Sequence, residues 1–138
     1  MRNLGFCELA HPADLALQVR GRDLSSLYLN AARGLSHLLQ AIPVEPLAEP
    51  VDVCLSLQAD DMETLMVDWL DEILYLTERE GRCWQVQSLN VERPPGLRAH
   101  VRCVGDRLPQ RAIKAVTYAG LSIVESAAGF ETVIVLDA

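Results

Sequence analysis

The sequence predicts a single α+β domain over residues 1–138, in which two helices pack on a mostly antiparallel β-sheet. Two observations support this fold class. Apolar side chains recur at helical spacing in two long segments, and they alternate with polar side chains in the shorter segments around them. Half of the 138 residues are hydrophobic and no stretch is low in complexity, so the chain can bury one core.

The N-terminal part is predicted to hold two strands and a helix. Residues 3–9 and 15–20 are the predicted strands, and a proline-containing turn joins them. Asp23 is the predicted N-cap of a helix whose apolar stripe continues to Ile42. Prolines end this helix, so residues 43–50 are expected to form a loop.

A half-buried strand and a second helix follow. Residues 51–59 alternate apolar and polar side chains, as a strand with one buried face does. Asp60 and Glu63 have the spacing of a capping box at the start of the helix. The polar side of this helix carries three carboxylates close together, which predicts either a solvated acidic face or a cation-binding surface: Asp68, Asp71 and Glu72.

Residues 84–91 and 97–104 are predicted to form a hairpin around a turn with two prolines and a glycine. The second strand carries a basic stripe, and such a stripe is more often a solvated sheet face than a binding site. It consists of Arg98, His100 and Arg102.

The C-terminal part is predicted to end in a pair of strands, residues 119–125 and 130–137, after a segment at 113–118 that the pattern does not assign. Counting by two places Asp137 on the strand face of Val133, which is expected to face the core. A carboxylate at the end of a core-facing row is costly unless a donor, a cation or a metal pairs with it. The alternative is that the chain has already reached solvent at residue 137, as chain termini usually do.

The composition limits the function. The net charge of −7 argues against direct binding of nucleic acid, because surfaces that neutralise phosphates are basic. An acidic surface suits a cation or a basic protein partner. No apolar run is long enough to span a bilayer and the N-terminus has no signal-peptide core, so we expect a cytoplasmic protein with no membrane contact.

The four cysteines, at positions 7, 54, 83 and 103, lack CxxC spacing and lie in or beside predicted strands. We therefore expect small buried side chains in a reducing compartment rather than zinc ligands. The GxGxxG, Walker, HExxH, GxSxG and EF-hand motifs are also missing from the sequence, so the chemistry that depends on them has no support.

Four segments, in order along the chain, resemble the archease family of small proteins that assist RNA ligation. Residues 11–14 (HPAD) stand where the family usually has HTAD, and residues 67–76 (VDWLDEILYL) are close to its VDWLNELLYL. Residues 114–118 (KAVTY) match a family segment, and residues 133–137 (VIVLD) match its apolar strand with a near-terminal Asp. The four motifs together are specific, although each alone is weak.

The resemblance implies a protein cofactor of an RNA ligase and not an independent enzyme. Archease-like proteins promote guanylylation and multiple turnover of the GTP-dependent tRNA-splicing ligase. That ligase joins 3′-phosphate or 2′,3′-cyclic-phosphate ends to 5′-hydroxyl ends. The residues expected to face this partner lie within or beside the family-like motifs: His11, Asp68, Glu72 and Lys114.

The resemblance also implies a divalent cation, such as calcium, held by Asp14, Asp137 and Ala138. Oxygen-only ligands of this kind select hard cations such as calcium or magnesium. Two alternatives stay open at this point. One is an enzyme that uses such a metal for phosphoryl transfer or hydrolysis, and the other is a chaperone-like module for nucleic-acid-processing proteins.

Three departures from the family pattern bear on ligase activation more than on metal binding. Pro12 replaces the usual Thr, and Ala119 replaces the His that usually follows Thr-Tyr. Residues 105–112 lack the His and the acidic residue that are common there.

Overall fold

The structure, a computed structural model, describes residues 5–9, 15–39, 43–80, 82–107, 113, 115–117 and 120–137, and for residues 43–48, 79–80 and 106–107 it describes the backbone alone. The elements follow the order β1 (Phe6–Leu9), β2 (Leu15–Gly21), α1 (Leu24–Leu38), β3 (Pro43–Gln58), α2 (Met62–Glu80), β4 (Arg82–Glu92), β5 (Gly96–Arg107), β6 (Ala115–Thr117), β7 (Val124–Ser126) and β8 (Gly129–Asp137).

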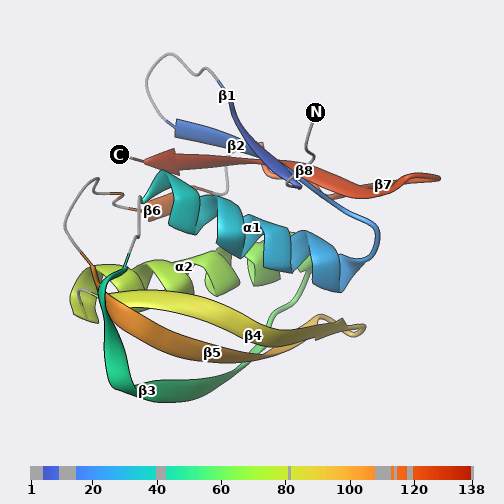
Figure 1. Cartoon of the computed structure of the whole chain (residues 1–138). Coiled ribbons are helices and arrows are strands. Elements are labelled where there is room, and N and C mark those ends of the chain that lie inside the picture. The colour runs from blue at the N-terminus through green and yellow to red at the C-terminus, as the bar shows by residue number, and fades with distance from the viewer. Residues whose placement is uncertain are drawn as a thin grey trace.

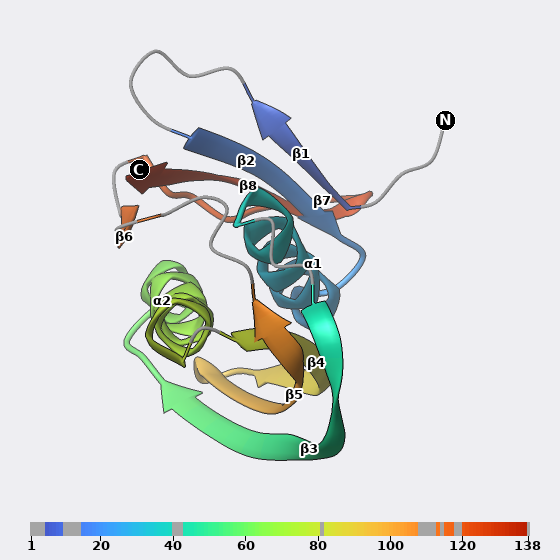
Figure 2. The ribbon, with the colours of Figure 1, turned by 60° about the vertical axis from the view of Figure 1, so that its left-hand side comes forward.

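Both helices lie between two antiparallel sheets, as Figures 1 and 2 show. One sheet has the strand order β1-β2-β8-β6, with β7 also paired to β8, and the other has the order β3-β5-β4. Helix α1 contacts β2 and β4, and helix α2 contacts β6 and β4. The predicted α+β class with two helices is confirmed, but the strands form two sheets where one was expected. In the described part of the chain, neither helix is long and apolar enough to cross a membrane.

Helix α1 begins where the sequence predicts. The backbone N–H of Ser26 donates to the Asp23 carboxylate at 2.7 Å, so Asp23 is the N-cap. The predicted apolar stripe is buried along the helix as far as Leu38, where α1 ends. The predicted extension to Ile42 lies outside the described residues.

Helix α2 is capped by the neighbour of the predicted residue. The backbone N–H of Thr64 donates to the Asp61 carboxylate at 2.7 Å, so Asp61 and not Asp60 is the cap. Adjacent aspartates give the same sequence signal, and the pattern could not choose between them. Glu63 instead accepts a hydrogen bond from the backbone N–H of Ile123 at 3.0 Å, which ties the start of α2 to the segment before β7.

Residues 43–50 are strand and not the expected loop. They form the first half of β3, with register irregularities between Pro43 and Pro46 and between Pro46 and Val51. Because β3 lies at the edge of its sheet, prolines that donate no hydrogen bond are tolerated there. The predicted alternation over residues 51–59 is present, although Val51 is 42% exposed.

The two faces of β8 are the reverse of the prediction. Thr132, Ile134 and Leu136 are buried against the helices, whereas Val133 is 40% exposed and Asp137 is exposed. Both faces carry apolar side chains, so the alternation alone could not identify the one that the helices cover. Asp137 therefore lies on the outer face of the sheet, where its carboxylate is hydrated.

The cysteines also differ from the prediction. Cys83 and Cys103 are buried as expected, but Cys7 and Cys54 are exposed. The outer strand faces that carry Cys7 and Cys54 have no helix over them, so these side chains remain accessible to solvent.

Two buried aromatic residues join α1 to α2 by hydrogen bonds. The indole N–H of Trp69 donates to the Tyr28 carbonyl at 2.9 Å, and the Tyr28 hydroxyl donates to the Met62 carbonyl. Both side chains are fully buried. Burial raises the pKa of the Tyr28 hydroxyl, and the carboxylates of Glu63 and Asp61 raise this pKa further.

We predict that Tyr28→Phe lowers the free energy of unfolding at neutral pH by about 1–2 kcal/mol, because the Met62 carbonyl loses its donor. The pKa of Tyr28 is higher in the folded than in the unfolded state, so its stabilising effect is lost as the pH rises above about 10. The difference in the free energy of unfolding between wild type and variant, measured by urea denaturation, should therefore become smaller above that pH. A difference that does not change with pH would contradict this account.

Candidate functional site

Strand β8 ends between β2 and β6, at one end of the larger sheet. We call this end, together with the acidic face of α2 beside it, the acidic edge. Leu136 pairs with Leu15 at the start of β2, and it also pairs with Val116 of β6. Asp137 pairs with Ala115, the first residue of β6. The Asp137 carboxylate is therefore held at an exposed sheet edge with a defined neighbour on β6.

The acidic face of α2 lies against the same edge. Figure 2 shows β6 between the C-terminal end of β8 and α2, and α2 contacts β6. The backbone N–H of Val116 donates to the Asp71 carboxylate, so the contact includes a charged hydrogen bond. Asp71 is exposed as a residue although its carboxyl is partly desolvated, and Asp68 and Glu72 are half-buried beside it on this helix.

The electrostatics of this edge are unfavourable for added negative charge. Partial burial raises the pKa of the Asp71 carboxyl, and the neighbouring Asp68 and Glu72 raise it further, against the opposing hydrogen bond from Val116. An acidic group with this environment is stabilised by a cation or a basic side chain placed nearby.

Only some of the predicted site residues fall within the described structure. Asp68, Glu72 and Asp137 are described, and the structure brings their elements together around β6. The other predicted residues lie outside the described residues: His11, Asp14, Lys114 and Ala138. In the described part of the chain, no group of three His, Cys, Asp or Glu side chains is placed to hold a metal ion.

Asp71 is the residue whose position the sequence did not indicate. Its spacing to Asp68 and Glu72 predicts a shared acidic face, but it does not show which of the three carboxylates reaches another element. The contact with Val116 follows from how α2 packs against β6, which local spacing does not encode.

Two of the three residues of the predicted basic stripe on β5 contact the same carboxylate. The Arg102 guanidinium donates to Asp52 at 2.8 Å, and His100 lies 3.2 Å from the same carboxylate. Arg102, more than His100, holds the pKa of Asp52 below its usual range. These are cross-strand pairs on the solvated face of β3 and β5, as the sequence favoured.

Comparisons with known proteins agree with this architecture. Residues 6–138 match the model of the Archease protein family. The chain is 31% identical over 141 residues to Protein archease of Methanosarcina barkeri, covering 94% of this chain and 92% of that protein. It is 29% identical over 137 residues to Protein archease of Methanosarcina mazei, with the same coverage.

A solved structure shows the same fold. The solution structure of Methanobacterium thermoautotrophicum protein 1598 superimposes with a TM-score of 0.73 at 24% identity, covering 99% of this chain and 100% of that one. The family match spans nearly the whole chain, including the strands and helices that meet at the acidic edge. The chain therefore belongs to the archease family.

Proposed function

We propose that this protein is an accessory factor of the GTP-dependent tRNA-splicing RNA ligase and promotes guanylylation and multiple turnover of that enzyme. One observation carries the proposal beyond family membership. Three of the four family-like segments meet at one edge: residues 67–76 on α2, 115–117 on β6 and 133–137 on β8. The fourth segment, residues 11–14, directly precedes β2, whose first residue pairs with Leu136.

We further propose that Asp14, Asp137 and Ala138 hold a divalent cation at this edge. Asp14 precedes Leu15 in the sequence and Asp137 follows Leu136, and these two leucines are cross-strand partners. The donor set is all oxygen, which suits calcium or magnesium. A cation bound there offsets the mutual repulsion of the carboxylates that hold it.

The partner-facing surface in this proposal lies beside the cation. Asp68 and Glu72 of α2 contribute negative charge there, and His11 and Lys114 belong to the adjoining family-like segments. The arrangement suits a partner surface that carries positive charge. No direct contact with nucleic acid is required for this role, because the ligase itself binds the RNA.

The first prediction is that the purified protein alone joins no RNA and raises the number of products formed per ligase molecule. The assay uses an RNA with a 3′-phosphate and a 5′-hydroxyl end, with the ligase and GTP. Lys114→Ala should reduce the stimulation and leave the melting temperature nearly unchanged, as surface substitutions usually do. Joining by the protein alone would instead indicate an enzyme. Protection of the ligase from aggregation without added turnover would indicate a chaperone-like module.

The second prediction concerns the cation. We expect weak calcium affinity, on the order of 10⁻⁴–10⁻³ M, because the protein supplies few ligands. Calcium at tenfold excess over this dissociation constant should stabilise the fold by about 1.4 kcal/mol. Asp137→Asn should remove both this stabilisation and the ligase stimulation, and without calcium it should be neutral or mildly stabilising. Glu125→Gln, an exposed carboxylate on β7, is the matched control. Full calcium stabilisation of the Asp137→Asn variant would exclude this site.

The third prediction concerns Asp71. Its pKa is raised in the folded state, so the ionised carboxylate destabilises the fold at neutral pH, and this penalty disappears below about pH 4. Asp71→Asn keeps an oxygen for the Val116 N–H and removes the charge. The variant should be more stable by a few tenths of a kcal/mol at neutral pH without calcium. This gain should vanish at acidic pH, whereas Glu49→Gln on the exposed edge strand should change little. A variant that is less stable at neutral pH would contradict the prediction.

A further inference from the structure

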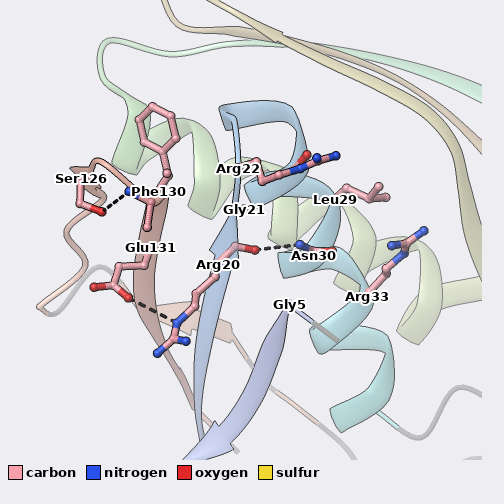
Figure 3. A pocket seen from close by; sticks show the side chains of 13 residues that line it. Gly5, Arg20, Gly21, Arg22, Leu29, Asn30, Arg33, Ser126, Phe130 and Glu131 are labelled. Atoms are coloured by element: carbon pink, nitrogen blue, oxygen red, sulfur yellow. Dashed lines mark hydrogen bonds and ion pairs between the residues drawn. The ribbon is translucent and has the colours of Figure 1, made fainter. Parts of the chain in front are cut away.

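A pocket lies at the opposite end of β8 from Asp137. Its volume is about 660 Å³, it lies between the N-terminal half of α1, the end of β2 and the β7–β8 turn, and Figure 3 shows it from close by. Strand β8 has nine residues, so the pocket lies about 26 Å from the acidic edge. The pocket and the acidic edge can therefore be tested separately.

The pocket is basic although the protein is acidic. Three arginines line it, Arg20, Arg22 and Arg33, against one carboxylate, that of Glu131. Arg20 lies 3.5 Å from Glu131, and Figure 3 shows these two side chains pointing toward each other. Arg22 and Arg33 are exposed, and in the described part of the chain neither forms an ion pair within 4.0 Å. The hydrogen bonds from Ser26, and after them the charge of Arg22, do lower the pKa of the neighbouring Asp23 carboxyl.

The other polar groups of the pocket already have partners. The Asn30 amide donates to the Arg20 carbonyl at 2.7 Å, and the Ser126 hydroxyl accepts from the Ala128 backbone at 3.2 Å. In the first turn of α1 the backbone N–H of Ser26 also has a partner, because it donates to the Asp23 carboxylate. The guanidinium groups are the charged donors that line the pocket.

Packing within the fold explains the glycines of the pocket wall. A Cβ on Gly5 would lie 2.4 Å from the Asn30 amide nitrogen, and one on Gly129 would lie 2.4 Å from the Gly21 carbonyl oxygen. Both glycines also have positive φ angles. The fold does not require Arg22 or Arg33 in the same way, since both side chains are exposed.

The spacing of Arg22 and Arg33 limits the shape of a ligand that contacts both. Arg22 precedes the N-cap Asp23, and Arg33 is the tenth residue of α1, about 14 Å along the helix axis from the first residue of that helix. Figure 3 shows Leu29 between them, with both arginine side chains extending to the same side of the helix. A single ligand that contacts both must be elongated and carry more than one negative group. Leu29 and Phe130 are half-buried and offer apolar contacts.

We propose that this pocket binds an elongated ligand with several phosphate groups, of the size of a nucleoside triphosphate, through Arg22 and Arg33. The planar guanidinium fork matches phosphate oxygens in a bidentate manner. A pocket of about 660 Å³ lies within the range of small-molecule sites. The phosphates can belong to a free nucleotide or to the end of a single RNA strand, and Phe130 can stack on a base in either case.

Calorimetry at low salt with a chelator tests the proposal with three probes: inorganic tripolyphosphate, GTP and a short single-stranded oligoribonucleotide with a terminal phosphate. We expect binding that weakens with added salt. Arg22→Gln and Arg33→Gln should each weaken binding about tenfold, the loss expected for one charge-assisted hydrogen bond. Arg98→Gln, an exposed arginine on the far sheet, is the matched control and should bind as wild type does.

Tighter binding of GTP than of the oligoribonucleotide would identify a free nucleotide as the source of the phosphates, and the reverse would identify an RNA end. Three results would overturn the proposal. The first is that no probe binds at millimolar concentration. The second is that Arg98→Gln weakens probe binding as much as Arg22→Gln and Arg33→Gln do. The third is that a poly-glutamate peptide binds as tightly as the phosphate probes and depends on the same arginines. Asp137→Asn should leave the binding unchanged, so failure here is distinguishable from failure of the proposed ligase role.

Discussion

The structure depends on the contact between Tyr28 and Trp69, which fixes the helical layer that both sheets cover. Trp69 donates to the Tyr28 backbone, and Tyr28 donates back to the first residue of α2, so each helix satisfies a buried polar group of the other. Further hydrogen bonds extend from this layer to both sheets. Ser25 of α1 accepts from Val91 of β4 at 3.0 Å, and Glu63 of α2 accepts from Ile123, ahead of β7.

Strand β8 then organises the larger sheet and with it the acidic edge. It pairs with β2, β6 and β7, so segments that are distant in the sequence meet along one strand. Its core-facing residues hold α1, while its last residue, Asp137, is left exposed beside β6. Because Asp71 of α2 accepts a hydrogen bond from Val116, the acidic helix and the end of β8 are coupled through a strand of only three residues.

Charge is distributed unevenly between the two ends of this strand. Asp71 of α2 and Asp137 lie beside β6 at one end, whereas Arg20, Arg22 and Arg33 line the pocket at the other. The protein therefore has a basic pocket although its net charge is −7. The two ends present charge of opposite sign, and they share no side chains.

The sequence by itself determined the α+β class, the Asp23 cap, the β4–β5 hairpin and the family, because these follow from local periodicity, capping chemistry and short motifs. It indicated Asp137 as a site residue but placed it on the wrong face, since both faces of β8 are apolar. Only the tertiary structure decided that the strands form two sheets, that residues 43–50 pair as an edge strand, and that Asp71 reaches Val116. The physical reason is that local patterns encode which side chains avoid water, whereas the packing of one element against another decides which face is covered.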